Sequence, residues 1–110
     1  GHTIGHAIEA AAGGKLSHGQ AVAIGLAAVS KLSVMKGLLI SNKCDQIILQ
    51  LKKLGLPTTL KGIDKQKVFQ ALKLDKKGGS FVLIKDIGQL QTGVKVETVL
   101  IEKVLEEVIV

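Results

Sequence analysis

Apolar residues recur along much of this chain with the spacing of an amphipathic helix, about 3.6 residues per turn. Between residues 41 and 54 they fall at Ile47, Ile48, Leu51 and Leu54, and between residues 97 and 108 at Leu100, Ile101, Val104, Leu105 and Val108. Charged side chains fill positions between the apolar ones in the second segment. The pattern predicts a helix in each segment, with one face in the core and the other in water.

Two more helices are predicted near the N-terminus. Residues 3–12 are rich in alanine and end at a pair of glycines, and a second helix should run from Ser17 or His18 to about Lys36. Residues 21–29 are apolar on every face, so we expect this helix to be surrounded by protein and to be the most buried element. Its small residues suit close packing in the centre of a helical bundle.

The sequence of the remaining segments predicts N-caps for two helices and one β-hairpin. Ser41 or Asn42 should cap the third helix, and Asp64 should cap a short fourth one. Residues 81–84 are β-like, and residues 93–96 can return beside them as a small hairpin. The predicted fold is therefore mainly α and multihelical, with one small β-hairpin.

Composition narrows the range of partners. The formal net charge is +6, and all fifteen positive residues are lysines scattered along the chain. A nucleic-acid reader would normally use arginines and aromatic platforms, and this chain has no arginine and two phenylalanines as its aromatic residues, so we expect no nucleic-acid partner. No apolar run reaches the length of about eighteen residues that a membrane span needs. With Cys44 as the single cysteine, we expect a cytoplasmic protein.

The three histidines all fall within the first eighteen residues, at His2, His6 and His18. Imidazole is the commonest protein ligand for transition metals and the usual acid–base group near neutral pH, so the cluster predicts a site. His2 and His6 share a helix face, and His18 can return to them from the next helix. The spacing leaves open which two histidines bind a metal. Thr3 replaces the glutamate of the helical zinc protease motif, which argues against a protease.

A second candidate element is the run Asp75-Lys76-Lys77-Gly78-Gly79. Paired lysines beside glycines can reach a phosphate as mobile point charges. The same residues are also typical of a solvent-facing turn, so this run alone supports either interpretation.

Two runs of sequence, taken with the motifs that follow them, are specific enough to indicate a protein family. They are Gly1-His2-Thr3-Ile4-Gly5-His6-Ala7-Ile8-Glu9 and His18-Gly19-Gln20-Ala21-Val22-Ala23-Ile24-Gly25, followed by Gly55-Leu56-Pro57, Asp75-Lys76-Lys77, Phe81-Val82-Leu83 and Ile87-Gly88. In order and spacing they resemble the C-terminal half of the 3-dehydroquinate synthases. The resemblance implies that residues 1–110 form a helical metal- and substrate-binding domain, with the NAD-binding N-terminal domain outside this chain.

The resemblance also implies a reaction and a set of residue roles. These enzymes convert 3-deoxy-arabino-heptulosonate 7-phosphate into 3-dehydroquinate and phosphate in the shikimate pathway, with NAD and Zn²⁺ or Co²⁺. By this resemblance His2 and His18 are two of three metal ligands, and the third, a glutamate, lies upstream of this chain. His6 contacts the phosphate region of the substrate, and Lys76, favoured over Lys77, binds the phosphate. The full-length protein is expected to be a homodimer.

Two departures from the family pattern stand out. Gln20 replaces the acidic residue that usually follows His-Gly, which would make the metal site less negative if that carboxylate tunes a ligand. The chain also begins at Gly1, within the motif that carries the resemblance and not with a methionine, and its one methionine is Met35, so we expect a piece of a longer protein that is inactive on its own.

Three alternatives stay open at this point. One is another sugar-phosphate cyclase of the same superfamily, of the inosose- or valiolone-forming type. The second is a metal-dependent polyol dehydrogenase, although such enzymes do not usually share the double histidine block. The third is a non-catalytic basic helical module that binds an acidic partner, which would explain the charge and leave the histidine cluster unexplained.

Overall fold

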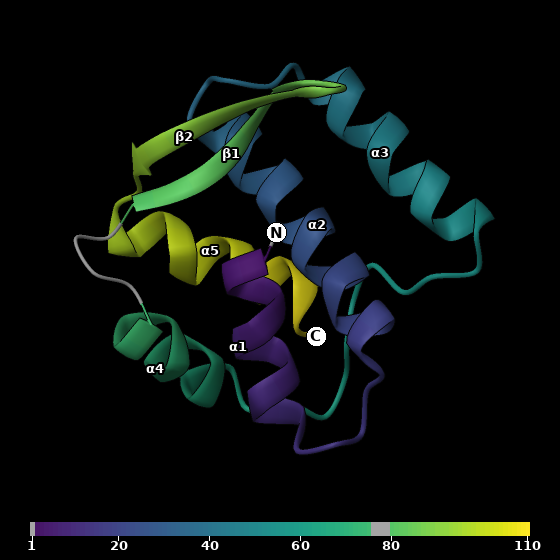
Figure 1. The fold of residues 1–110 in the computed structure, drawn as a ribbon, viewed down its shortest axis with the longest axis vertical. Helices are drawn as coiled ribbons and strands as arrows, with labels where there is room; N and C mark the ends of the chain where they lie inside the picture. Colours follow the sequence, from purple (N-terminus) through teal and green to yellow (C-terminus); the bar gives the residue numbers. More distant parts are fainter. Residues whose placement is uncertain (1, 76–79) are drawn as a thin grey trace.

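Figure 1 shows helices packed around a central helix, with a hairpin covering one end. This computed structural model describes the backbone of residues 2–75 and 80–110 and the side chains of residues 4–72 and 81–110. Within those residues the elements are α1 (His2–Ala12), α2 (His18–Met35), α3 (Ser41–Lys53), α4 (Lys65–Asp75), β1 (Ser80–Asp86), β2 (Gln89–Lys95) and α5 (Thr98–Val108). The mainly α fold with one small hairpin is confirmed.

The helix α2 is the centre of the packing, as its uniformly apolar sequence predicts. It packs against α1, α3, α5 and β1. Between residues 21 and 29 every residue except Val22 and Leu26 is buried. The apolar faces of α1 and α5 complete the core around it through side chains such as Ile8 and Val104, both fully buried.

The predicted ends of the helices hold with one exception. The α4 helix follows Asp64, whose Oδ1 accepts a hydrogen bond from the amide of Gln66 at 2.9 Å, so the predicted cap is confirmed. The predicted cap of α3 by Ser41 or Asn42 is wrong. Ile40 is the N-cap residue and makes no side-chain capping bond, and Ser41 is already inside the helix, where its hydroxyl is not placed to cap.

The hairpin lies where the sequence predicts it, and its strands are longer than predicted. Phe81 stands opposite Val94 in an antiparallel pair, with register irregularities between Phe81 and Leu83 and between Ile84 and Asp86. A hydrogen bond ties the hairpin to α2: the amide of Ile84 donates to Ser33 Oγ at 2.9 Å. A short parallel bridge between Leu60 and Ile109 joins the segment after α3 to the end of α5.

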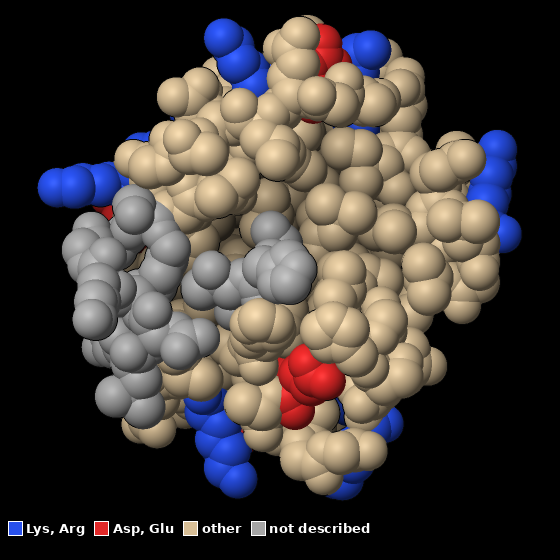
Figure 2. Space-filling model, viewed as in Figure 1, with Lys and Arg blue, Asp and Glu red and all other residues tan. Residues whose placement is uncertain are grey.

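Three features of the structure correspond to points raised by the composition: the distribution of lysines, the single cysteine and the apolar character of the helices. On the face shown in Figure 2, lysines lie around the periphery and do not gather into one patch. Cys44 is buried on α3, and desolvation raises the pKa of its thiol above the ordinary value of 9.0. In the described part of the chain, no helix combines the length and the apolar character that a membrane span requires.

Candidate metal and substrate site

The helices α1 and α2 bring two of the three histidines together. They run in opposite directions and are joined by a turn in which Gly13 and Gly14 have φ angles of 58° and 89°. Such left-handed backbone is accessible to glycine at little cost, so the chain reverses directly after α1. The ring centroids of His6 and His18 lie 6.2 Å apart, with the ring planes tilted by 36°, and both residues are exposed.

A glycine lets the two helices approach at this site. A Cβ atom on Gly5 would lie 3.2 Å from the carbonyl oxygen of Ala21 and 3.5 Å from the Cα of Val22. These distances mean that the backbone of α1 packs directly against the backbone of α2. Because Gly5 precedes His6 and Ala21 lies one turn after His18, this contact sets the spacing between the two imidazoles.

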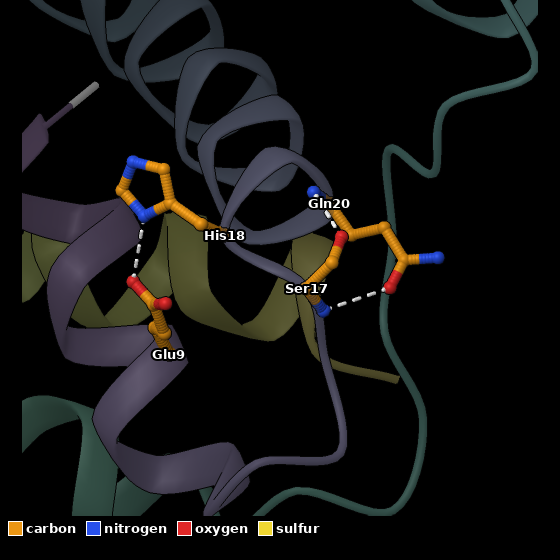
Figure 3. Close-up of polar contacts among 4 residues, drawn as sticks. All are labelled: Glu9, Ser17, His18 and Gln20. Carbon is orange, nitrogen blue, oxygen red and sulfur yellow. Dashed lines mark hydrogen bonds and ion pairs between the residues drawn. The ribbon is translucent and has the colours of Figure 1, made fainter.

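His18 is held in place by the first turn of α2 and by a carboxylate from α1. Ser17 caps the helix: its Oγ accepts from the amide of Gln20, and Gln20 Oε1 accepts from the amide of Ser17, each at 3.1 Å. The Nδ1 atom of His18 lies 3.0 Å from Oε1 of Glu9. Figure 3 shows the second ring nitrogen of His18 on the opposite side of the imidazole, pointing away from Glu9.

In the structure Gln20 helps to cap α2, a role that fits its spacing of three residues from Ser17. Its side chain completes the capping box and lies on the far side of His18 from Glu9 (Figure 3). Glutamine and glutamate serve equally at this position of a capping box. The replacement of an acidic residue by Gln20 therefore leaves the cap intact, and its effect on a metal at this site stays a prediction.

The side chains of the other predicted site residues lie outside the described part of the chain. His2 is the first residue of α1, one turn before His6. The structure describes its backbone, but its side chain lies outside the described part of the chain. Lys76 and Lys77 fall in residues 76–79, between α4 and β1, and are also outside that part. Among the side chains that the structure does describe, no cluster of three or more His, Cys, Asp or Glu could hold a metal ion.

Glu9 is a site residue to which the sequence motif alone assigns no role. Its spacing did carry a signal: Glu9 lies three residues after His6, so the two share a helix face.

The comparisons with known proteins agree with this architecture. A solved structure of 2-deoxy-scyllo-inosose synthase, complexed with carbaglucose-6-phosphate, NAD⁺ and Co²⁺, superposes with a TM-score of 0.84 at 27% identity, covering 96% of this chain and 33% of that one. A second structure of a 2-deoxy-scyllo-inosose synthase superposes with a TM-score of 0.78 at 29% identity, over 96% of this chain and 30% of that one. The fold is thus that of the sugar-phosphate cyclases.

The family is narrower than the fold. The family described as 3-dehydroquinate synthase C-terminal matches residues 1–78, and the chain belongs to it. The 3-dehydroquinate synthase of Streptococcus mutans is 49% identical over 78 residues, which cover 70% of this chain and 22% of that protein. The enzyme of a Synechococcus strain is 39% identical over 114 residues, covering 98% of this chain and 31% of that protein. The chain thus spans a third or less of its relatives' length.

Proposed function

We propose that this chain is the metal- and substrate-binding part of a longer 3-dehydroquinate synthase, a carbon–oxygen lyase. The intact protein would convert 3-deoxy-arabino-heptulosonate 7-phosphate into 3-dehydroquinate and phosphate. The observation that carries the proposal is the pairing of His6 and His18 across α1 and α2, in a chain that belongs to this family. An N-terminal domain outside the chain would bind NAD, and we expect the intact protein to be a cytoplasmic homodimer.

The imidazole of His18 suits a metal ion of intermediate hardness such as Zn²⁺. Imidazole nitrogens are good ligands for Zn²⁺ and Co²⁺. His18 uses Nδ1 to contact Glu9, which leaves Nε2 as its free donor atom. His18 and His2 would hold the ion together with a carboxylate from outside the chain. When bound, such an ion supplies Lewis acidity that lowers the pKa of a coordinated hydroxyl.

His6 and Lys76 would act on the substrate. His6 is exposed beside His18, so its imidazole can meet a phosphorylated sugar held at the same place. The ammonium group of Lys76 would bind the phosphate dianion and offset the charge on the leaving group. Both side chains thus position the phosphate, and an imidazole is also able to move a proton near neutral pH.

Single histidine variants of the intact protein test these roles. His2→Ala and His18→Ala should each abolish tight Zn²⁺ binding, measured by competition with a chromophoric chelator. His6→Ala should keep Zn²⁺ binding and lose phosphate release by about 100-fold or more. Lys76→Ala should lose activity in the same way, and Lys52→Ala, which changes an exposed lysine on α3, is the matched control.

The 110-residue chain alone should release no phosphate, with or without added NAD and Zn²⁺. If it does so above a metal-only blank, the proposed division between the two domains is wrong.

The structural neighbours favour one second candidate, a cyclase that acts on a hexose phosphate. The intact protein should be offered the heptulosonate phosphate and glucose 6-phosphate in parallel, with NAD and Zn²⁺, and the products identified by mass spectrometry. We expect 3-dehydroquinate from the first and no carbocycle from the second. An inosose from glucose 6-phosphate would replace the proposed function by that alternative.

A further inference from the structure

The contact between Glu9 and His18 joins the two helices at the candidate site. The Oε1 atom of Glu9 lies 3.0 Å from Nδ1 of His18, a hydrogen-bonding distance. The side chain of His18 is 60% exposed and that of Glu9 36% exposed, so the contact lies at the surface of this chain. The other ion pairs of the described residues join Glu97 and Glu107 to lysines, away from the histidines.

An ionised carboxylate constrains an imidazole in two ways. A carboxylate can only accept hydrogen bonds, so a neutral His18 must carry its proton on Nδ1 to make this contact. The lone pair then resides on Nε2. The hydrogen bond also fixes the rotation of the ring, so that Nε2 points away from Glu9, as Figure 3 shows.

Both partners of the contact are held by the fold. Glu9 belongs to α1, whose backbone packs directly against α2 at Gly5. His18 is the first residue of α2 and follows the capping box of Ser17 and Gln20. The geometry of the pair therefore depends on rigid elements, which is how a partner outside the ligand set orients a metal ligand.

We propose that Glu9 is a positioning residue that holds His18 in the tautomer and orientation in which Nε2 binds the metal ion. The inference rests on the proposed function, because it takes His18 to be a metal ligand. Glu9 itself contacts neither the metal nor the substrate in this account. Partners of this kind typically contribute about 10- to 100-fold to metal affinity.

The test compares Glu9→Ala and Glu9→Gln with the wild-type intact protein. Glutamine keeps the length of the side chain, but it can donate as well as accept, so it no longer selects one tautomer. Glu107→Gln is the matched control, because it removes the same charge from an exposed ion pair with Lys31. Two readouts are needed: the His18 tautomer in the metal-free protein, from ¹⁵N shifts of the neutral ring, and the Zn²⁺ dissociation constant from chelator competition.

We expect the metal-free wild type to show His18 protonated on Nδ1. Glu9→Ala should weaken Zn²⁺ binding by about 10- to 100-fold, Glu9→Gln by less, and Glu107→Gln by less than twofold. A purely structural role would lower the thermal midpoint of Glu9→Ala and leave the tautomer and the Zn²⁺ affinity of the folded variants unchanged.

Three results would overturn the inference. One is a wild-type His18 protonated on Nε2, and another is wild-type Zn²⁺ affinity in both Glu9 variants; either leaves the proposed function standing. The third is Zn²⁺ binding that does not depend on His18, which would remove the metal assignment of the proposed function together with this inference.

Discussion

Replacing Ser33 with alanine should destabilise the fold, because it leaves a buried amide of the hairpin without an acceptor. The Oγ atom of Ser33 donates to the carbonyl of Val29 at 2.7 Å and accepts from the amide of Ile84 at 2.9 Å. Ser33 is fully buried and Ile84 is 6% exposed, so water cannot easily take the place of the hydroxyl. Ser30 is the matched control: it is equally buried on α2, but its hydroxyl bonds the carbonyl of Leu26 and no other described group.

The size of the effect follows from these contacts. A buried donor left unsatisfied costs about 1–3 kcal/mol, so Ser33→Ala should lose that much of the free energy of unfolding. Ser30→Ala should change it by about 0.5 kcal/mol or less, since alanine is the better helix former and the carbonyl of Leu26 keeps its helical bond. Urea denaturation measures both variants, and hydrogen exchange of the Ile84 amide reports the contact itself. Equal stabilities for the two variants, or an Ile84 amide protected as in wild type, would refute the reasoning.

Two further predictions concern the helix contact at the site and the response to acid. Gly5→Ala should lower the thermal midpoint, because its Cβ, 3.2 Å from the buried carbonyl of Ala21, costs about 1–3 kcal/mol of overpacking against a helix-propensity gain of about 1 kcal/mol. A Cβ atom on Gly19 would have no neighbour within 4 Å, so Gly19→Ala should be neutral or stabilising. A Gly5→Ala protein more stable than wild type would contradict the close contact. The hydrogen bond from Lys36 lowers the pKa of Glu97 below its ordinary value of 4.5, so this contact stabilises the fold above pH 4.5 and is lost as the pH falls through the lowered pKa. Glu97→Gln should therefore be slightly less stable than wild type at pH 7 and equal to it in strong acid; a difference that persists in strong acid would argue against the ion pair.

The helices and the hairpin could be predicted because their signals are local. The all-apolar run at residues 21–29 can only be satisfied by burial, and the pairing of Phe81 with Val94 follows from two short β-like segments. The cap of α3 could not be predicted in the same way. Leu39 is buried in the core, and the helix begins directly after Ile40, which is therefore the N-cap residue. Ser41 is the first residue of the helix, one position too late for its hydroxyl to act as the cap.

The closeness of His6 and His18 could be predicted from the sequence, and the contacts around them less so. Histidines are rare in this chain, and the proximity of these two follows from two helices joined by a short turn. The contact between His18 and Glu9 depends on how closely those helices pack. The close packing occurs at Gly5, and a glycine in a helix does not by itself indicate a helix contact. Gln20 belongs to a capping box, which its spacing from Ser17 permits but which a comparison with the family pattern at this one position does not reveal.

The most direct test of this account is a crystal structure of the intact protein with Zn²⁺, with anomalous scattering recorded at the zinc edge. The account predicts a peak about 2.0–2.1 Å from Nε2 of both His2 and His18, the ordinary length of a zinc–imidazole bond. Glu9 should remain at Nδ1 of His18, and His6 should lie outside the coordination sphere. A zinc ion bound by His6 in place of His2, or reached by His18 through Nδ1, would contradict the account.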